Sequence, residues 1–376
     1  MSFTFTDEQT EFRGVLRRFL DDKSPPTEVR RLMATDEGMD AAVWRQLCDE
    51  LALAGMHIPQ EYGGAGFGFV ELGIVLEEMG RALLCAPYFS SSVLAAGAIM
   101  QAGRDAERRE LLPAIAAGTT RAALALTEAN GRWDAGGVRL TATPADGAYK
   151  LDGTKRLVVD GCTAELLVVV GREPGTCGNE GLSFFTVDAD SGDIKRRLLN
   201  TVDTTRKLAE ITFNGARAEP LGPVGQGAAA LEAILIEAAV ALANESAGGA
   251  QKMFDSALEY TQLRMQFGRP IGSFQAIKHR MADNLVALEL AKSAAYYAAA
   301  AVADRDNDLP ALASLAKAGV SDAYMHLAAE CIQLHGGIGF TWENDSHLWF
   351  KRAKSSEVFL GDPGYHRELL MQRWDV

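Results

Sequence analysis

The segment Arg264-Met-Gln-Phe-Gly-Arg-Pro-Ile-Gly-Ser-Phe-Gln-Ala-Ile-Lys-His-Arg-Met-Ala-Asp283 carries the strongest indication of this chain's architecture. It joins two long segments without proline through a tight turn that contains two glycines and Pro270. No proline lies between Pro223 and Pro270, so one long helix can fill this interval and end near Phe267. A second helix is predicted over residues 274–304.

A third helix is predicted further along the same region. The polar run at residues 304–308 indicates a loop, and Pro310 is well placed in the first turn of the helix that follows. Three or four long helices with apolar stripes predict a four-helix-type bundle domain for residues 223–376.

The sequence pattern of residues 1–118 predicts a separate all-helical domain. Apolar side chains recur there at helical spacing in three groups: Leu16, Phe19 and Leu20; Val43, Leu47 and Leu51; and Leu72, Val75, Leu76 and Met79. The first 25 residues mix charged with apolar side chains, which predicts an amphipathic helix and no signal peptide. The glycine-rich run at 62–68 follows no predicted strand and precedes no Lys-Ser or Lys-Thr pair. It therefore indicates an inter-helix loop and not a phosphate-binding loop.

Residues 119–222 have the texture of β structure. Short apolar runs, at 122–126, 157–159, 166–170, 182–187 and 211–213, alternate with Asp-Gly and Asn-Gly turn signals. These strands do not alternate with helices, which argues against a Rossmann sheet. The pattern predicts a compact antiparallel barrel or sandwich, and the whole chain an α+β multidomain fold.

Composition limits the classes of function. A chain of 376 residues with 48% hydrophobic residues can form two or three domains. A net charge of −13 disfavours binding to nucleic acid or to an anionic membrane. No stretch is apolar and uncharged for long enough to suggest a membrane span. The five scattered cysteines have no metal-ligand spacing, which argues against disulfides and a zinc site and suits a reducing cytoplasm.

A second signature follows about seventy residues after the first, Gln333-Leu-His-Gly-Gly-Ile-Gly-Phe340. The two segments, in this order and with these three domains, resemble the acyl-CoA dehydrogenase family along nearly the whole chain. In that family both segments bind the FAD of a neighbouring subunit. The resemblance implies one FAD per subunit, with contacts between subunits completing its site.

Two further motifs extend the resemblance. Leu126-Thr127-Glu128 is similar to the family's Thr-Glu-Pro strand end, and residues 153–159 are similar to its second flavin-facing strand. The resemblance then implies two sets of FAD contacts. The isoalloxazine would be lined by Leu126, Thr127, Leu157 and Val159. The FAD of a partner subunit would be reached by Arg264, Phe267, Gln275, Gln333, Gly336 and Gly337.

Physical chemistry supports the Arg264 assignment, since a guanidinium can bind pyrophosphate oxygens in a bidentate way that lysine cannot reproduce. Glycines allow close approach of backbone N–H groups to an anion. The alternative is that Arg264 interacts with the C-terminus of its own helix and that the glycines only turn the chain.

The chain departs from the family at two places. The family's Gly-Ser-Asp, whose serine binds the pyrophosphate, is replaced within Thr127-Glu-Ala-Asn-Gly-Arg-Trp-Asp134. The family's C-terminal Glu-Gly-Thr, which carries the catalytic glutamate, falls on Leu360-Gly361-Asp362. The base position is therefore leucine, while Asp362 is carried over as a cofactor-binding position.

The expected reaction needs a carboxylate that removes the α-proton of an acyl thioester. Some family members supply it from the helix before the Arg-x-x-Phe-Gly motif, at the position of Ala238 here. Glu245 lies on the same helical face two turns further on and is the leading candidate. Its alternative role is a buried ion pair, with Lys252 or at a subunit interface. Glu237, Asp362 and no base in this chain at all remain the other possibilities.

The resemblance supports three hypotheses about function. The first is an FAD-dependent acyl-CoA dehydrogenase that acts on a branched, cyclic or steroid-like acyl-CoA in lipid or steroid catabolism and reduces an electron-transfer flavoprotein. It would be a homodimer or homotetramer, or a heterotetramer with a related subunit. The second is a non-catalytic partner subunit of a heteromeric dehydrogenase. The third is a divergent oxidase, monooxygenase or desulfinase, because fold alone does not settle the reaction.

Overall fold

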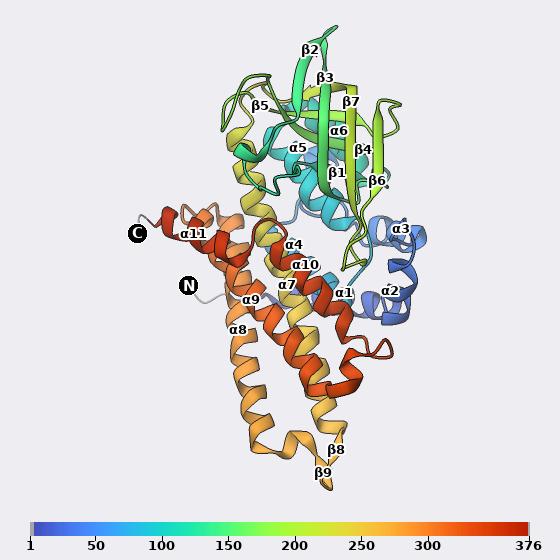
Figure 1. The fold of residues 1–376 in the computed structure, drawn as a ribbon, viewed down its shortest axis with the longest axis vertical. Helices are drawn as coiled ribbons and strands as arrows, with labels where there is room; N and C mark the ends of the chain where they lie inside the picture. The colour runs from blue at the N-terminus through green and yellow to red at the C-terminus, as the bar shows by residue number, and fades with distance from the viewer. Residues whose placement is uncertain (1–3, 375–376) are drawn as a thin grey trace. The chain divides into compact units, whose positions relative to one another are not determined.

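The computed structural model describes residues 4–374, with helices at both ends of the chain and strands between them (Figure 1). This order confirms the predicted α+β fold class. The first helices are α1 (Asp7–Lys23), α2 (Pro26–Met33), α3 (Ala41–Asp49), α4 (Phe69–Ala82), a π-helix (Phe89–Ala95), α5 (Ala96–Ala102) and α6 (Asp105–Ala116). The last are α7 (Ala228–Leu263), α8 (Gln275–Asp304), α9 (Leu309–His335), α10 (Ser346–Val358) and α11 (Pro363–Arg373).

The sheet contains β1 (Ala122–Ala125), β2 (Thr141–Ala145), β3 (Ala148–Val159), β4 (Leu166–Arg172), β5 (Leu182–Asp188), β6 (Ile194–Leu198) and β7 (Leu208–Leu221). Its order is β1-β4-β2-β3-β7-β5, and β5 also pairs with β4, so five strands close into a barrel. Most pairs are antiparallel as predicted, but β1 runs parallel to β4. The predicted apolar runs found five strands and missed β2 and β6, which are half-exposed and carry few apolar residues.

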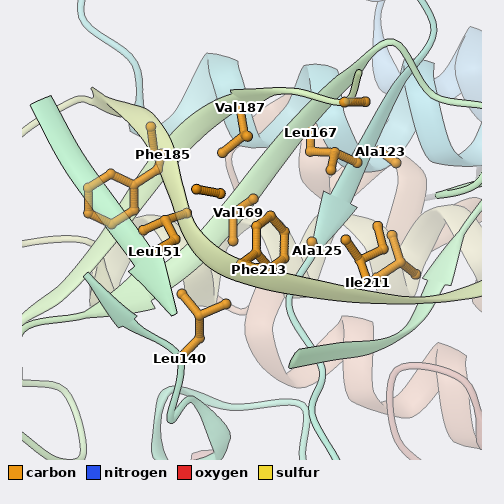
Figure 2. Packing of buried hydrophobic residues seen from close by; sticks show 14 of the residues in the cluster. Ala123, Ala125, Leu140, Leu151, Leu167, Val169, Phe185, Val187, Ile211 and Phe213 are labelled. Atoms are coloured by element: carbon orange, nitrogen blue, oxygen red, sulfur yellow. The ribbon is translucent and has the colours of Figure 1, made fainter. Parts of the chain in front are cut away.

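Buried aliphatic and aromatic side chains fill the barrel (Figure 2). Leu140 lies directly before β2, Leu167 and Val169 lie in β4, Phe185 in β5 and Phe213 in β7, and all are at most 2% exposed. Alternation along each strand sends these residues inward, because successive side chains on a strand point to opposite faces. The β domain therefore has its own core.

The turn after α7 differs from the prediction. The helix ends at Leu263, four residues before Phe267, because β8 (Met265–Gln266) pairs with β9 (Arg269–Pro270) in a short hairpin. Phe267 and Gly268 both have positive φ, +52° and +80°, which turns the chain back. The helices on either side are confirmed: α8 begins at Gln275, and Pro310 lies in the first turn of α9.

The contacts divide the chain into two compact units. One holds α1, α4, α8 to α11 and the part of α7 beyond Ala238, and the other holds α3, the π-helix, α5, α6 and the seven-stranded sheet. The predicted boundaries near 118 and 222 follow the change of element type, whereas these units follow the contacts. Each unit is described by itself below.

By length and composition, α8 is apolar enough to cross a membrane, contrary to the expectation from the sequence. This is weak evidence, since helices of soluble bundles pass the same test. In the bundle α8 lies beside α9 (Figure 1).

Candidate functional site

Arg264 and Phe267 lie at one end of the bundle, in the turn after α7. Both are exposed, and the Phe267 ring is 91% exposed. The Arg264 carbonyl accepts a hydrogen bond from Ile271 N at 2.8 Å, which closes the turn. Its guanidinium has no ion-pair partner among residues 4–374. An exposed guanidinium of this kind can bind an external anion.

The second signature lies against the same turn. The His335 ring at the end of α9 stacks on Tyr260 of α7, with ring centroids 4.2 Å apart. Gln333 is exposed, and a side chain at Gly336 or Gly337 would meet no atom within 4 Å. Packing within the unit therefore does not require these glycines, although Gly336 has φ +65°, a backbone conformation that favours glycine.

Gln275 joins this group as the first residue of α8. The rings of Phe267 and Phe274 touch edge to face, with centroids 6.2 Å apart, which places the start of α8 at the turn. We call residues 264–275 together with 333–340 the bundle tip. It brings together all six residues that the resemblance assigns to a partner's FAD. The Arg264 guanidinium and the exposed amides of Gln275 and Gln333 are donors that fit a pyrophosphate, whereas the Gly336 N–H already donates to the end of α9.

Leu126, Thr127, Leu157 and Val159 are held together in the β domain. Arg156 N donates to Thr127 O at 2.7 Å, which joins the exit of β1 to β3. The pairing of β3 with β7 shifts register between Lys155 and Val158, and Leu157 in this bulge has φ +56°. Bulges of this kind re-aim side chains and are frequent beside active sites. The four residues are therefore placed as one group.

The loop that replaces the family's Gly-Ser-Asp is organised by its own polar contacts. The Arg132 side chain forms an ion pair with Asp134 at 2.8 Å, and Asn130 Nδ2 donates to Gly137 O at 2.6 Å. Arg132 N in turn donates to the Asn130 side chain. No serine lies in this loop, so a pyrophosphate would have to find its donors elsewhere.

Glu245 is engaged in a buried ion pair. Arg352 Nη1 of α10 donates to Glu245 Oε1 at 2.8 Å, and both side chains are about 10% exposed or less. The Glu245 backbone also marks a close helix crossing, because a Cβ at Gly80 of α4 would lie 1.9 Å from its carbonyl oxygen. This is the ion-pair alternative from the sequence. Its partner is Arg352, however, whereas Lys252 lies over the Trp349 ring, 5.9 Å from the centroid.

Glu237 has a different environment. It is half-buried, and Gln101 Nε2 of α5 donates to its Oε1 at 2.8 Å. Burial raises the pKa of Glu237 to about 7, although the Gln101 hydrogen bond acts in the opposite direction. A carboxyl with a pKa near neutrality can exchange a proton at working pH. Glu237 therefore stays a candidate for the general base.

Asp362 caps a helix. Its Oδ1 accepts a hydrogen bond from Tyr365 N at 2.8 Å and fixes the start of α11. An N-cap carboxylate stabilises the helix and has one oxygen committed to the backbone. This contact gives Asp362 a structural role.

The segment before Asp362 has a strained backbone at Leu360. Leu360 has φ +62°, and Gly361 has φ +101°. The Leu360 carbonyl is 3.0 Å from His366 Nε2, and the buried Lys317 Nζ donates to Gly361 O and Glu357 O at 3.1 Å each. Burial lowers the pKa of Lys317 to about 8 and that of His366 to about 4. A leucine in left-handed conformation costs about 1 kcal/mol or more, so the surrounding contacts hold it there.

Comparison with known proteins identifies the family. Residues 6–119 match the N-terminal domain model of acyl-CoA dehydrogenases and residues 225–374 match the C-terminal one. Acyl-CoA dehydrogenase IpdE2 of Mycobacterium tuberculosis is 34% identical, over 97% of this chain and 95% of that protein. Butyryl-CoA dehydrogenase of Megasphaera elsdenii superposes with a TM-score of 0.93 at 25% identity, with all of both chains covered.

A second solved structure, a variant of the Tcur3481-Tcur3483 steroid ACAD, gives a TM-score of 0.87 at 30% identity over 98% of each chain. The predicted resemblance is thus confirmed by sequence and by structure. The chain belongs to the acyl-CoA dehydrogenase family, whose members are FAD-dependent oxidoreductases that act on CH–CH groups.

Proposed function

We propose that this chain is a subunit of an acyl-CoA dehydrogenase that introduces a double bond between the α and β carbons of an acyl-CoA thioester. Bound FAD supplies the oxidising power by accepting the β-hydride. The observation that carries the proposal is the exposed guanidinium of Arg264, which has no ion-pair partner among residues 4–374 and lies in the bundle tip with the exposed amides of Gln275 and Gln333. Electrons would pass to an electron-transfer flavoprotein, and a reducing cytoplasm remains the predicted location.

The bundle tip supports a partner subunit. Phe267 and Phe340 are 91% and 79% exposed there, which is unusual for side chains of this size in a protein that stays alone. Arg264 would bind the pyrophosphate of the FAD that the neighbour holds, with the glutamine amides as further donors. The β-domain group around Leu126 and Leu157 would contact the isoalloxazine of this chain's own FAD, where one is bound.

A two-chain enzyme is the arrangement that the side chains favour. Neither family base position is acidic, since Ala238 and Leu360 occupy them. Glu245 is bound to Arg352 and Asp362 caps α11, so neither is arranged as a base. One solved relative is named as a pair of chains and as a steroid enzyme, which supports a related partner and a branched, cyclic or steroid-like acyl group here.

The pKa of Glu237 favours a second candidate, a chain that is competent alone. With its pKa raised to about 7, Glu237 could accept the α-proton at neutral pH. In that case the chain would assemble as a homodimer or homotetramer.

One experiment separates these candidates. The chain is purified alone and together with a second acyl-CoA dehydrogenase chain from the same genome. Flavin content, mass by light scattering and anaerobic bleaching by a panel of acyl-CoA thioesters are then measured. Bleaching only in the two-chain complex supports the heteromer, and bleaching of the chain alone supports the Glu237 enzyme. A flavin that no thioester bleaches in either preparation contradicts acyl-CoA dehydrogenation and points to a different flavin reaction.

A further inference from the structure

Lys155 is a lysine at the centre of the β domain, with a side chain that is 0% exposed. Its Nζ donates to Glu128 Oε1 at 2.8 Å and to Leu126 O at 2.9 Å. Charged side chains are almost never fully buried unless they are paired, and each one carries a large desolvation cost. The contacts of this ammonium group therefore need an explanation beyond core packing.

The Glu128 carboxylate is also held by several hydrogen bonds. Its Oε1 also accepts hydrogen bonds from Arg139 N at 2.8 Å and Leu140 N at 2.9 Å. Burial alone would raise the pKa of Glu128, but the attraction of Lys155 and the hydrogen bonds hold it below its usual value. The pair thus ties three segments of chain together: the exit of β1, the strand β3, and the backbone before β2.

The pair acts where two strands leave their regular pairing. β1 ends at Ala125, so the carbonyls of Leu126 and Thr127 lie beyond its ladder with β4. Instead, these carbonyls accept hydrogen bonds from two consecutive residues of β3. Leu126 O accepts from Lys155 Nζ, and Thr127 O accepts from Arg156 N. Directly after these residues β3 bulges. The two contacts therefore fix Leu126 and Thr127 relative to Leu157 and Val159.

We propose that the buried Lys155–Glu128 pair is a positioning device for the flavin-facing surface, and that FAD affinity depends on the hydrogen bond from Lys155 to the Leu126 carbonyl. This inference rests on the proposed function, since it takes the residues around Leu126 and Leu157 as flavin contacts. Neither member of the pair needs to touch the cofactor. Their effect is to hold the backbone that does.

A double substitution separates positioning from stability. Lys155→Met alone leaves Glu128 charged and buried, so it should lower the melting temperature as well as FAD affinity. Lys155→Met with Glu128→Gln removes both charges, and the glutamine oxygen can still accept from Arg139 N and Leu140 N. Stability should then return toward that of the wild type, while the Leu126 carbonyl still lacks its donor.

The measurements are the melting temperature of the apoprotein and the dissociation constant for FAD, in whichever preparation of the wild type holds flavin. The double variant should melt near the wild type and bind FAD about tenfold or more weakly, the effect expected for a lost charge-assisted hydrogen bond. Lys150→Met is the matched control, because Lys150 is an exposed lysine on the same strand. It should match the wild type in both measurements.

Two outcomes overturn the inference in different ways. A double variant that binds FAD as tightly as the wild type shows that the pair only supports the fold. A wild type that binds no FAD, alone or with its partner chain, overturns the proposed function and this inference with it.

A pH series on the wild type decides the matter if the double variant does not fold. Burial and the nearby Arg172 lower the pKa of Lys155 to about 8, against the attraction of Glu128. The ammonium group is therefore lost as pH rises through 8, and FAD affinity of the wild type should fall between pH 7 and 9. The FAD affinity of the Lys150→Met control should fall over the same pH interval. An affinity that stays constant up to the pH at which the protein unfolds contradicts the positioning role.

Discussion

Arg352 Nη1 lies 2.8 Å from Glu245 Oε1, and the two side chains link α10 to α7 as a buried ion pair. Glu245 stands on the helical face from which some family members present their base. Glu245 lies two turns beyond Ala238, the residue at the expected base position, and its charge is already neutralised by Arg352. The ion pair therefore explains Glu245 as a structural residue. A catalytic role for Glu245 would have to account for this ion pair as well.

Substitution of Arg352 tests this explanation. Arg352→Met should lower the free energy of unfolding by about 3–5 kcal/mol, because Glu245 is left buried without its partner charge. Glu245→Leu combined with Arg352→Met should recover most of the loss, as apolar replacements of buried pairs often do. Urea titration of the three proteins measures both effects. If instead Glu245→Gln keeps full stability and lowers turnover by about 10²–10⁴-fold, Glu245 is the base.

Arg264→Lys should reduce the FAD content of the purified enzyme, because an ammonium group cannot reproduce the bidentate fork. Arg217→Lys, on an exposed part of β7, is the control and should retain its flavin. The flavin-to-protein ratio is read from the absorbance spectrum. Equal ratios in the two variants would refute the role of Arg264 at the FAD site.

Glu237→Gln should change the pH dependence of stability. The folded pKa of about 7 lies above the ordinary value of 4.5, so the native state binds the extra proton between these values. The contribution of Glu237 is full below pH 4.5 and is lost as pH rises through 7. Between pH 4.5 and 8 the wild type should lose about 1–3 kcal/mol relative to the glutamine variant. Denaturant midpoints across this range are the measurement, and parallel curves would contradict the raised pKa.

The same variant tests catalysis. If Glu237 is the base, turnover of the wild type should rise as pH passes 7, and Glu237→Gln should lower it by about 10²–10⁴-fold at pH 8. A variant with wild-type turnover at pH 8 would leave the chain without a base of its own and would favour the two-chain enzyme.

Leu360→Glu should add a base to this chain. The segment is already held in its left-handed shape by Lys317 and His366, so the new carboxylate would occupy the position that the family uses. Turnover of an acyl-CoA panel with an artificial electron acceptor should exceed that of the Leu360→Gln control by about 10²–10⁴-fold. Equal rates from two flavin-loaded variants would show that this segment is not at the reacting carbon.

Much of the fold could be predicted from local signals. Proline and glycine positions gave α8 and the start of α9 within one residue, since these residues act on the backbone directly. The end of α7 was missed because a two-residue hairpin, which has almost no sequence signal, unwinds the expected last turn. The parallel pairing of β1 with β4 was missed because it depends on contacts between distant segments.

The candidate site was less predictable, since it depends on which buried charges meet. Nothing in the spacing links Glu245 to Arg352, which are more than a hundred residues apart. Lys155 could have been suspected, because it shares the strand parity of the buried Leu151. Its partner Glu128 could not have been identified from the sequence, because only the folded barrel brings β1 against β3.

Under the proposed two-chain assembly, the exposed aromatic side chains of the bundle tip would affect how the cell handles this protein. A newly made chain that has not met its neighbour presents Phe267 and Phe340 to water. Chaperones and proteases recognise such surfaces, so the supply of this subunit would be limited by the supply of the subunit that covers it. Degradation of unassembled subunits would then keep the amounts of the two subunits equal, even if the cell made them at different rates.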